Sequence, residues 1–194
     1  MIQINANLFA RVAVAQSTEA TRYYLGGVCI QPHPRGEGVT LTATDGHCLL
    51  TAHDPKADPA TLPAGGIIVN LGKDGLKAAR KGQTVTIDPA TGDASVDNAW
   101  RSASTTIVDG AFPDWRRILP QGDQVATGAA FDVKILSRLG DALCDWRKSS
   151  HGLTMRGADD ASPHIIACDT PDAAIFAVCM PIRVTPATAT PAWL

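Results

Sequence analysis

The sequence predicts an α+β protein in which antiparallel strands alternate with amphipathic helices. Runs rich in β-branched residues are separated by turns that contain Gly, Pro or Asp. Three longer segments place apolar residues at helical spacing. A similar strand entry, in which a glycine leads into a run of apolar and threonine residues, recurs at 38–41, 82–86 and 152–155. These observations predict three units with the order strand, helix and three strands, although ordinary α+β proteins also alternate in this way to bury one-sided strands against helices.

The first unit is expected within the first 53 residues. Its helix covers residues 7–17, where Leu8, Val12 and Ala15 share one face and Asn5 or Asn7 supplies the N-cap. The Pro- and Gly-rich stretch 31–38 and the Asp-Gly pair at 45–46 separate its later strands. The four strands are predicted over residues 2–4, 23–30, 39–45 and 48–53.

The same order is expected twice more. The second unit has a helix over residues 71–81, which Asn70 caps and Gly82 closes. Its strands are predicted at 66–70, 84–88, 94–97 and 101–108. The third unit has a helix from residue 133 to about 146, with strands at 129–132, 152–156, 164–168 and 173–184.

The composition is that of an ordinary globular protein, with 45% hydrophobic and 19% charged residues in a chain of 194. The five cysteines are odd in number and have no CxxC spacing, which favours a reducing cytosol over a disulfide framework. No apolar run reaches the roughly 20 residues that span a bilayer, and the amino terminus does not have the pattern of a signal peptide. We therefore expect a soluble, cytoplasmic protein without a membrane partner.

Basic residues on predicted helices indicate a nucleic-acid partner. The formal net charge is −2, so attraction to phosphate has to come from a local cluster. Four basic residues within 71–81 share one helix face, and three from the other helices extend it if the helices lie on one side. Such a stripe can follow duplex phosphates without reading the base sequence, but taken alone the segment is more typical of a solvated helix face. The predicted DNA-binding residues are Arg11, Lys73, Lys77, Arg80, Lys81, Lys134 and Arg138.

Four segments of the chain resemble a known family. Residues 21–28 read TRYYLGGV and residues 42–47 read TATDGH, and together they resemble the paired motif in the middle domain of bacterial DNA sliding clamps, the DNA polymerase III beta subunit family. Residues 108–120, VDGAFPDWRRILP, resemble the link from that domain into the last one. Residues 178–184, VCMPIRV, resemble the carboxy terminus of the clamps, and the motifs stand in the family's order.

The resemblance implies the DNA-clamp fold, built of βαβββ half-domains with helices on the inner face and antiparallel sheets outside. It implies a complete domain over residues 1–120, a partial domain over 121–184 and a flexible tail over 185–194. It further implies a non-enzymatic processivity factor of DNA replication, with no cofactor, metal or catalytic residue. Its partners would be double-stranded DNA and the peptide motifs of DNA polymerase and the clamp loader. The alternative is a peptide-binding module that modulates the replication machinery without encircling DNA.

In the family the four segments form an apolar cleft that accepts short peptide tails. Leu, Ile, Val and Met would supply apolar area, while His and Arg at the rim would orient a partner backbone or carboxylate. Taken singly, residues 44–47 could be only a tight turn, and residues 112–114 only a linker that anchors Phe112 and Trp115. By match to the family motifs, the predicted cleft residues are Leu25, Thr44, Gly46, His47, Leu49, Pro113, Arg117, Ile118, Val178, Met180, Pro181, Ile182 and Arg183.

The sequence departs from the family pattern in residues and in extent. Cys48 stands where the family usually has a basic residue, Gly26 where it has asparagine, and Ile182 and Val184 replace other apolar types. Nothing in the sequence resembles the family's first domain, and the stretch after residue 120 resembles only the second half of the last one. Family rings contain twelve half-domain units, so unit counting predicts a homo-oligomeric ring of four chains, with a dimer as the alternative.

The tail ends in Trp193 and Leu194, so it either docks in a cleft like a peptide ligand or stays disordered.

An enzyme is the rival class. His164 with Cys168, or Asp45 with His47 and Cys48, could be read as partial metal sites. Residues 149–151, Ser-Ser-His, invite a nucleophile reading. None of these groups has a complete ligand set, or a base and an orienting residue at a recognisable spacing, so we do not expect catalysis.

Overall fold

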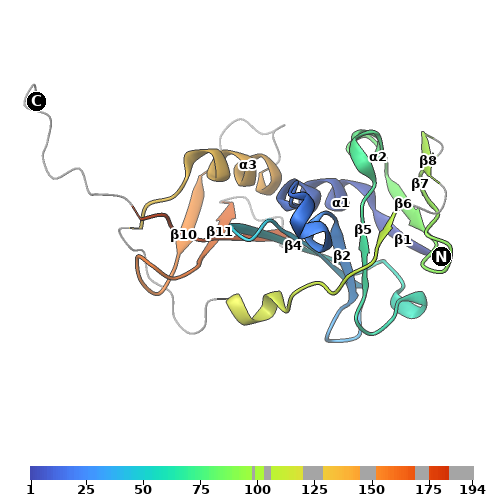
Figure 1. Ribbon diagram of the computed structural model, residues 1–194, viewed down its shortest axis with the longest axis horizontal. Helices are drawn as coiled ribbons and strands as arrows, with labels where there is room; N and C mark the ends of the chain where they lie inside the picture. Colours follow the sequence, from blue (N-terminus) through green and yellow to red (C-terminus); the bar gives the residue numbers. More distant parts are fainter. Residues whose placement is uncertain (98, 103–105, 120–128, 145–151, 169–174, 184–194) are drawn as a thin grey trace, which may run out of the picture.

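The computed structural model describes residues 1–97, 99–102, 106–119, 129–144, 152–168 and 175–183. Within these ranges the elements form two antiparallel sheets with three α-helices packed beside them. Figure 1 shows α3, α1 and α2 following one another along the long axis of the molecule. No helix in these ranges is long and apolar enough to cross a membrane.

The larger sheet has eight strands in the order β10-β11-β12-β4-β3-β2-β5-β9. Its centre is the pairing of β4 with β12, in which Val178 lies opposite Leu49 and Cys179 opposite Cys48. This pairing makes one continuous sheet from strands of the first and third predicted units. The strands are β2 (Val28–Pro32), β3 (Val39–Thr44), β4 (Cys48–Asp54), β5 (Ile67–Val69), β9 (Ile107–Val108), β10 (Leu153–Arg156), β11 (His164–Cys168) and β12 (Ile175–Cys179).

The smaller sheet has the order β1-β6-β7-β8. Its strands are β1 (Ile2–Asn5), β6 (Thr84–Ile87), β7 (Ala94–Val96) and β8 (Trp100–Ser102). The first two predicted units exchange their opening strands, because β1 pairs with β6 of the second unit while β5 pairs with β2 of the first. Neither unit therefore completes a sheet alone.

The helices begin close to the predicted positions and are shorter than predicted. Helix α1 covers Ala6–Val12, and the Asn5 side chain accepts a hydrogen bond from the Leu8 N–H, as an N-cap does. The chain then tightens into a 3-10 turn over Ala13–Ala15 instead of continuing to residue 17. The predicted cap at Asn5 is thus confirmed, while Asn7 lies inside the helix.

The predicted cap of α2 (Gly72–Ala79) is wrong in detail, because the N-cap is Leu71, which makes no side-chain cap hydrogen bond. Asn70, one residue earlier, accepts through Oδ1 from the Gly72 N–H at 2.8 Å, and after the helix the Gly82 N–H donates to the Ala78 carbonyl. Helix α3 covers Val133–Leu143, and its N-cap Asp132 accepts from the Lys134 N–H at 2.7 Å. The predicted end of α3 near residue 146 lies outside the described residues.

Two apolar clusters lie on opposite faces of the eight-stranded sheet. Along β4, Cys48 and Leu50 point toward α1 and α3 and join the main core, whereas Leu49 points the other way. Strand β12 alternates in the same manner, with Ala177 and Cys179 in the main core and Val178 on the opposite face. Burial of each large apolar side chain in the main core, such as Phe9, stabilises the fold by about 1.5–3 kcal/mol.

Three predicted strands were wrong in detail. Residues 20–25 form a 3-10 helix, Ala20–Leu25, so β2 starts only at Val28, where Gly27 allows the backbone of β5 to approach closely. The predicted strand 101–108 is two strands in different sheets, because Arg101 pairs with Ser95 and Ile107 with Val69. The predicted strand 129–132 is a single bridge between Ala130 and Ile182.

The division of the chain at residue 120 stays a prediction. Residues 120–128 and 184–194, which include the predicted tail 185–194, lie outside the described part of the chain. The β4–β12 pairing carries the sheet across the predicted boundary.

Candidate peptide-binding site

The turn between β3 and β4 is held by its own side chains. The Thr44 hydroxyl donates to the Cys48 carbonyl at 2.7 Å and accepts from the Gly46 N–H at 3.1 Å. Asp45 Oδ1 accepts from the His47 and Cys48 N–H groups at 2.9 and 3.0 Å. Gly46 has a φ of +90°, which favours glycine, and both Gly46 and His47 are exposed. The turn therefore presents His47 to solvent on a fixed backbone.

Helix α3 contributes Arg138 to the inner side of this turn. Its Nη2 lies 2.6 Å from Asp45 Oδ2 and 2.8 Å from Cys48 Sγ. Burial opposes ionisation of Asp45, but hydrogen bonds from Arg138 and from the Cys48 and His47 N–H groups hold the carboxyl pKa below its ordinary value. Burial likewise opposes the charge on Arg138, and the hydrogen bond to Asp45 still leaves its pKa raised. The pair is a partly buried ion pair between the third and first units.

The carboxy-terminal segment runs beside this turn. Val178 lies opposite Leu49 in the β4–β12 register, and beyond the strand the Met180 N–H donates to the His47 carbonyl at 3.1 Å. After Pro181, the Ile182 N–H donates to the Ala130 carbonyl at 2.8 Å. The predicted cleft residues of segments 42–49 and 178–183 are thus in direct contact.

The link segment closes over the same face of the sheet. Its 3-10 helix, Trp115–Ile118, lies on the side of the eight-stranded sheet opposite α3 (Figure 1). The Trp115 ring packs with Leu49 and Val178 in the second apolar cluster, against which Phe112, Leu119 and Phe176 also pack. Gln31 Oε1 accepts from Trp115 Nε1 and from Arg116 Nη1, each at 3.3 Å. This anchoring fixes Arg117 and Ile118, the next residues of the turn.

Segment 21–28 joins the site through Arg22 and Tyr24. Arg22 Nη1 donates to the Asp45 carbonyl at 3.2 Å. The Tyr24 side chain packs so closely on Gly110 that a Cβ added at Gly110 would lie 2.9 Å from the Tyr24 Cβ. Leu25 is buried, and its carbonyl accepts from the Ser17 N–H at 2.9 Å. All four motif segments therefore contact one another, directly or through one neighbour.

The assembled surface combines buried and exposed apolar groups. Leu25, Leu49 and Val178 are buried, whereas Ile118, Met180 and Ile182 are 45%, 40% and 43% exposed. Exposed large apolar side chains beside a buried apolar cluster are typical of a surface that binds apolar groups of a partner. Of the remaining predicted residues, Thr44 is buried. The others are partly or fully exposed to solvent, namely Gly46, His47, Pro113, Arg117, Pro181 and Arg183.

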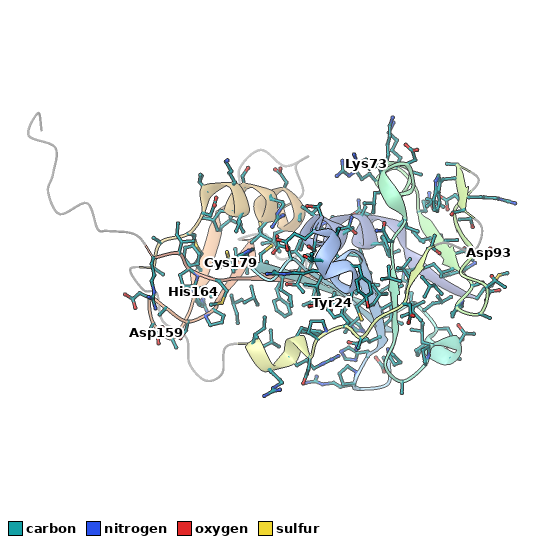
Figure 2. All side chains as sticks on the ribbon, in the orientation of Figure 1. Tyr24, Lys73, Asp93, Asp159, His164 and Cys179 are labelled. Atoms are coloured by element: carbon teal, nitrogen blue, oxygen red, sulfur yellow. The ribbon has the colours of Figure 1, made fainter. Side chains whose placement is uncertain are left out.

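The predicted DNA-binding residues divide into two groups. Five of them are exposed, namely Lys73, Lys77, Arg80, Lys81 and Lys134. Figure 2 shows Lys73 on the outer side of α2. The other two have internal partners: Arg138 binds Asp45, and Arg11 donates from Nη2 to the Leu143 carbonyl at 2.9 Å, at the end of α3. Their guanidinium groups hold α3 in place.

Sequence reasoning missed the inward-facing partners of the site. Gln31, Phe176 and Arg138 support the predicted cleft residues but were not predicted to do so. Strand alternation could have found Phe176, since it lies two residues before Val178 and shares its face. No local signal indicates Gln31 or Arg138, because each meets its partner from a different element.

The constellations read as enzyme sites have packing roles where they are described. His164 is buried, with its Nδ1 2.9 Å from the Ser162 carbonyl and its ring edge-on to Phe131. Cys168 lies at the far end of the same strand. Residues 149–151 lie outside the described ranges, and within those ranges no three His, Cys, Asp or Glu side chains gather as metal ligands would.

Comparisons with known proteins agree with the fold and the motifs. No family model matches the chain. The beta sliding clamp of Caulobacter vibrioides is 32% identical over 122 residues, which is 59% of this chain and 32% of that relative. The crystal structure of the Caulobacter crescentus DNA polymerase sliding clamp matches with a TM-score of 0.67 and 24% identity, over 94% of this chain and 65% of that one. The Bartonella birtlesii DnaN sliding clamp, solved bound to griselimycin, matches with a TM-score of 0.66 and 20% identity over the same shares.

The structural matches confirm the predicted α+β clamp fold. The Caulobacter vibrioides relative is also similar in sequence. The chain spans about a third of the length of the curated relative in the alignment and under two thirds of the matched structures. In fold, and in sequence over 122 residues, the chain is similar to the bacterial beta sliding clamps.

Proposed function

We propose that this chain is a sliding-clamp-like processivity factor of DNA replication. It would associate with duplex DNA without sequence specificity and tether DNA polymerase and other partners through an apolar peptide-binding cleft. The observation that supports the proposal is the contact among four segments distant in sequence. Trp115 packs with Leu49 and Val178, the Met180 N–H donates to the His47 carbonyl, and Arg22 donates to the Asp45 carbonyl. The fold brings these segments together, so the proposal depends on the chemistry of the side chains that they present.

The cleft would work by burying apolar side chains of a partner peptide. Ile118, Met180 and Ile182 offer exposed apolar area beside the packed Leu49–Val178 pair. Covering about 200 Å² of such surface contributes roughly 5 kcal/mol before the costs of association. The exposed His47 and Arg183 would orient a peptide backbone or carboxylate at the rim.

The DNA surface would be the opposite side of the molecule. Helix α2 carries Lys73 and Lys77, and Arg80 and Lys81 follow directly after it. The predicted cleft residues Leu49 and Val178 point away from the helices, so DNA and a peptide would meet different faces. Ammonium and guanidinium groups along a helix bind phosphates through charge, which explains association without sequence preference.

Encirclement of DNA requires more than one chain. Among the described strands, four pair with a single neighbour and end their sheets, namely β1, β8, β9 and β10. Sheet edges of this kind can pair with another chain. We propose a homo-oligomer, with a ring of four chains by unit counting and a dimer as the smaller assembly. Light scattering at micromolar concentration is expected to give the mass of an oligomer, and a monomer would refute the ring.

Two experiments test the function. On a primed circular template, the chain is expected to lengthen the products that a replicative DNA polymerase makes per binding event. Retention on closed circular DNA, lost when the circle is cut, would indicate a ring, whereas a peptide-binding module would behave alike on both forms.

Labelled griselimycin is expected to bind at the proposed cleft. The absence of both griselimycin binding and longer polymerase products would refute the proposal.

A further inference from the structure

Two sulfur atoms lie close together where α3 and β11 end. Cys144 directly follows the last residue of α3, and Cys168 is the last residue of β11. Their Sγ atoms are 2.8 Å apart, although 24 residues separate them in sequence. A disulfide bond has a length of about 2.05 Å, so the two sulfurs need to approach by less than about 1 Å.

We propose that Cys144 and Cys168 are a site of reversible oxidation, at which thiol–disulfide exchange with a small disulfide such as glutathione disulfide links α3 to β11. The inference is independent of the proposed clamp function, because it rests on the thiol geometry alone.

The exchange proceeds in two balanced steps. Cys144 is the more exposed of the pair, so its thiolate attacks one sulfur of glutathione disulfide and displaces one glutathione thiolate. The Cys168 thiolate then attacks the Cys144 sulfur of the mixed disulfide and displaces the second glutathione. The two cysteines together lose two electrons and two protons, and one glutathione disulfide becomes two molecules of glutathione.

The other three cysteines are poor competitors. Burial raises the pKa of Cys29 and Cys48 to about 12 and that of Cys179 to about 11, which keeps them as thiols. Exchange requires the thiolate. Cys48 and Cys179 do lie opposite each other across β4 and β12, but the Cys48 sulfur contacts Asp45 and Arg138 while the Cys179 sulfur faces the Met180 carbonyl.

The bond would fasten three elements at one point. Arg11 of α1 already donates to the carbonyl of Leu143, the residue before Cys144. A covalent link from Cys144 to Cys168 would therefore fix the end of α3 to β11 and, through Arg11, to α1. The bond would close a loop between residues 144 and 168 and so restrict the conformations of the unfolded chain. Because this stabilises the folded state, we expect a rise of about 5 °C in the melting temperature.

The test counts thiols in the full chain before and after oxidation. The reduced protein has five, and incubation with glutathione disulfide is expected to leave three, restored to five by dithiothreitol. Peptide mapping is expected to find Cys144 joined to Cys168. Cys144→Ser is expected to abolish the internal bond and the melting shift, and Cys168→Ser to stop at a glutathione adduct on Cys144.

Matched variants make the outcome decisive. Cys29→Ser removes a buried cysteine elsewhere and is expected to lose two thiols on oxidation as the wild type does. Retention of all five thiols, or a mapped bond between Cys48 and Cys179 instead, would overturn the proposal. A loss of two thiols that Cys144→Ser leaves unchanged would overturn it as well.

Discussion

Arg138 of α3 and Asp45 of the β3–β4 turn form a 2.6 Å ion pair that joins the third unit of the chain to the first. The same guanidinium lies 2.8 Å from the sulfur of Cys48, the position at which the family usually has a basic residue. A positive charge is therefore present beside this turn, supplied from another element. Because Asp45 also accepts the N–H groups of His47 and Cys48, the ion pair bears on the shape of the turn at the proposed cleft.

Breaking this ion pair is expected to destabilise the fold. Arg138→Gln and Asp45→Asn each leave a partly buried charge without its partner, which costs about 2 kcal/mol in the free energy of unfolding. The double variant is expected to be less destabilised than the sum of the two, because the second substitution removes no further pair. Arg138→Lys keeps the charge and is expected to lie between wild type and Arg138→Gln. Urea unfolding at pH 7 measures all four variants, and strictly additive losses would contradict the pairing.

The pair also makes stability depend on pH in a defined direction. The folded-state pKa of Asp45 lies below its ordinary value, so the unfolded chain binds more protons at acidic pH. Its contribution is therefore present above about pH 4 and is lost as the pH falls through the folded-state pKa. Asp45→Asn lacks this contribution, so its stability deficit relative to wild type is expected to shrink below pH 4. Asp109→Asn, which removes an exposed carboxylate, serves as the charge-matched control, and a deficit that stays constant with pH would be evidence against the assignment.

Met180 is the residue whose substitution separates binding from folding. Its side chain is exposed beside His47, so Met180→Glu is expected to leave the free energy of unfolding within about 0.5 kcal/mol of wild type. The added charge would oppose burial of an apolar partner, and we expect at least a tenfold loss of griselimycin affinity. Thr154→Glu adds the same charge to exposed β10, two strands further along the sheet, and is expected to bind as wild type does. Equal affinities for both variants, measured by fluorescence anisotropy, would move the binding site elsewhere.

The sequence predicted the regular elements well because their signals are local. Asn5 caps α1 through the Leu8 N–H, and the turn chemistry of Asp45 and Gly46 separates β3 from β4. Segment 20–25 was misjudged because Tyr23 and Tyr24 favour strands, whereas the local backbone closes into 3-10 turns. The sequence could not predict which sheet a strand joins, because strand pairing depends on contacts between distant segments.

The sequence motifs predicted which residues belong to the candidate site, but not the partners of those residues in the folded chain. Spacing on α3 put Lys134 and Arg138 on one face, and both were expected at a DNA surface. The structure exposes Lys134 but turns Arg138 toward Asp45, 93 residues away in sequence. A helical repeat assigns a face to a residue, but the partner on that face comes from tertiary packing. The same limit applies to the sulfurs of Cys144 and Cys168.

Two glycines at the end of the β2–β3 hairpin test the packing of the larger sheet. Gly36 and Gly38 both have positive φ, at +86° and +70°. An added Cβ at Gly36 meets nothing within 4 Å, whereas at Gly38 it would lie 2.1 Å from the Asp54 carbonyl oxygen. Gly36→Ala is thus expected to cost about 1 kcal/mol of backbone strain, and Gly38→Ala at least about 3 kcal/mol. Thermal unfolding compares the two, and equal losses would contradict the close approach of the two backbones.

The exposed lysines of α2 provide the test of DNA association. Each lysine that contacts a phosphate releases counterions, so the double variant Lys73→Gln/Lys77→Gln is expected to lower the slope of log affinity against log salt by about 2. Its affinity for duplexes of unrelated sequence is expected to fall equally, because phosphate contacts carry no base information. The double variant Arg35→Gln/Lys56→Gln removes the same charge from exposed positions outside the predicted stripe and is expected to keep the wild-type slope. Fluorescence anisotropy with labelled duplexes at several salt concentrations measures both variants. If the two slopes fall together, only the net charge matters, and α2 does not track the DNA backbone.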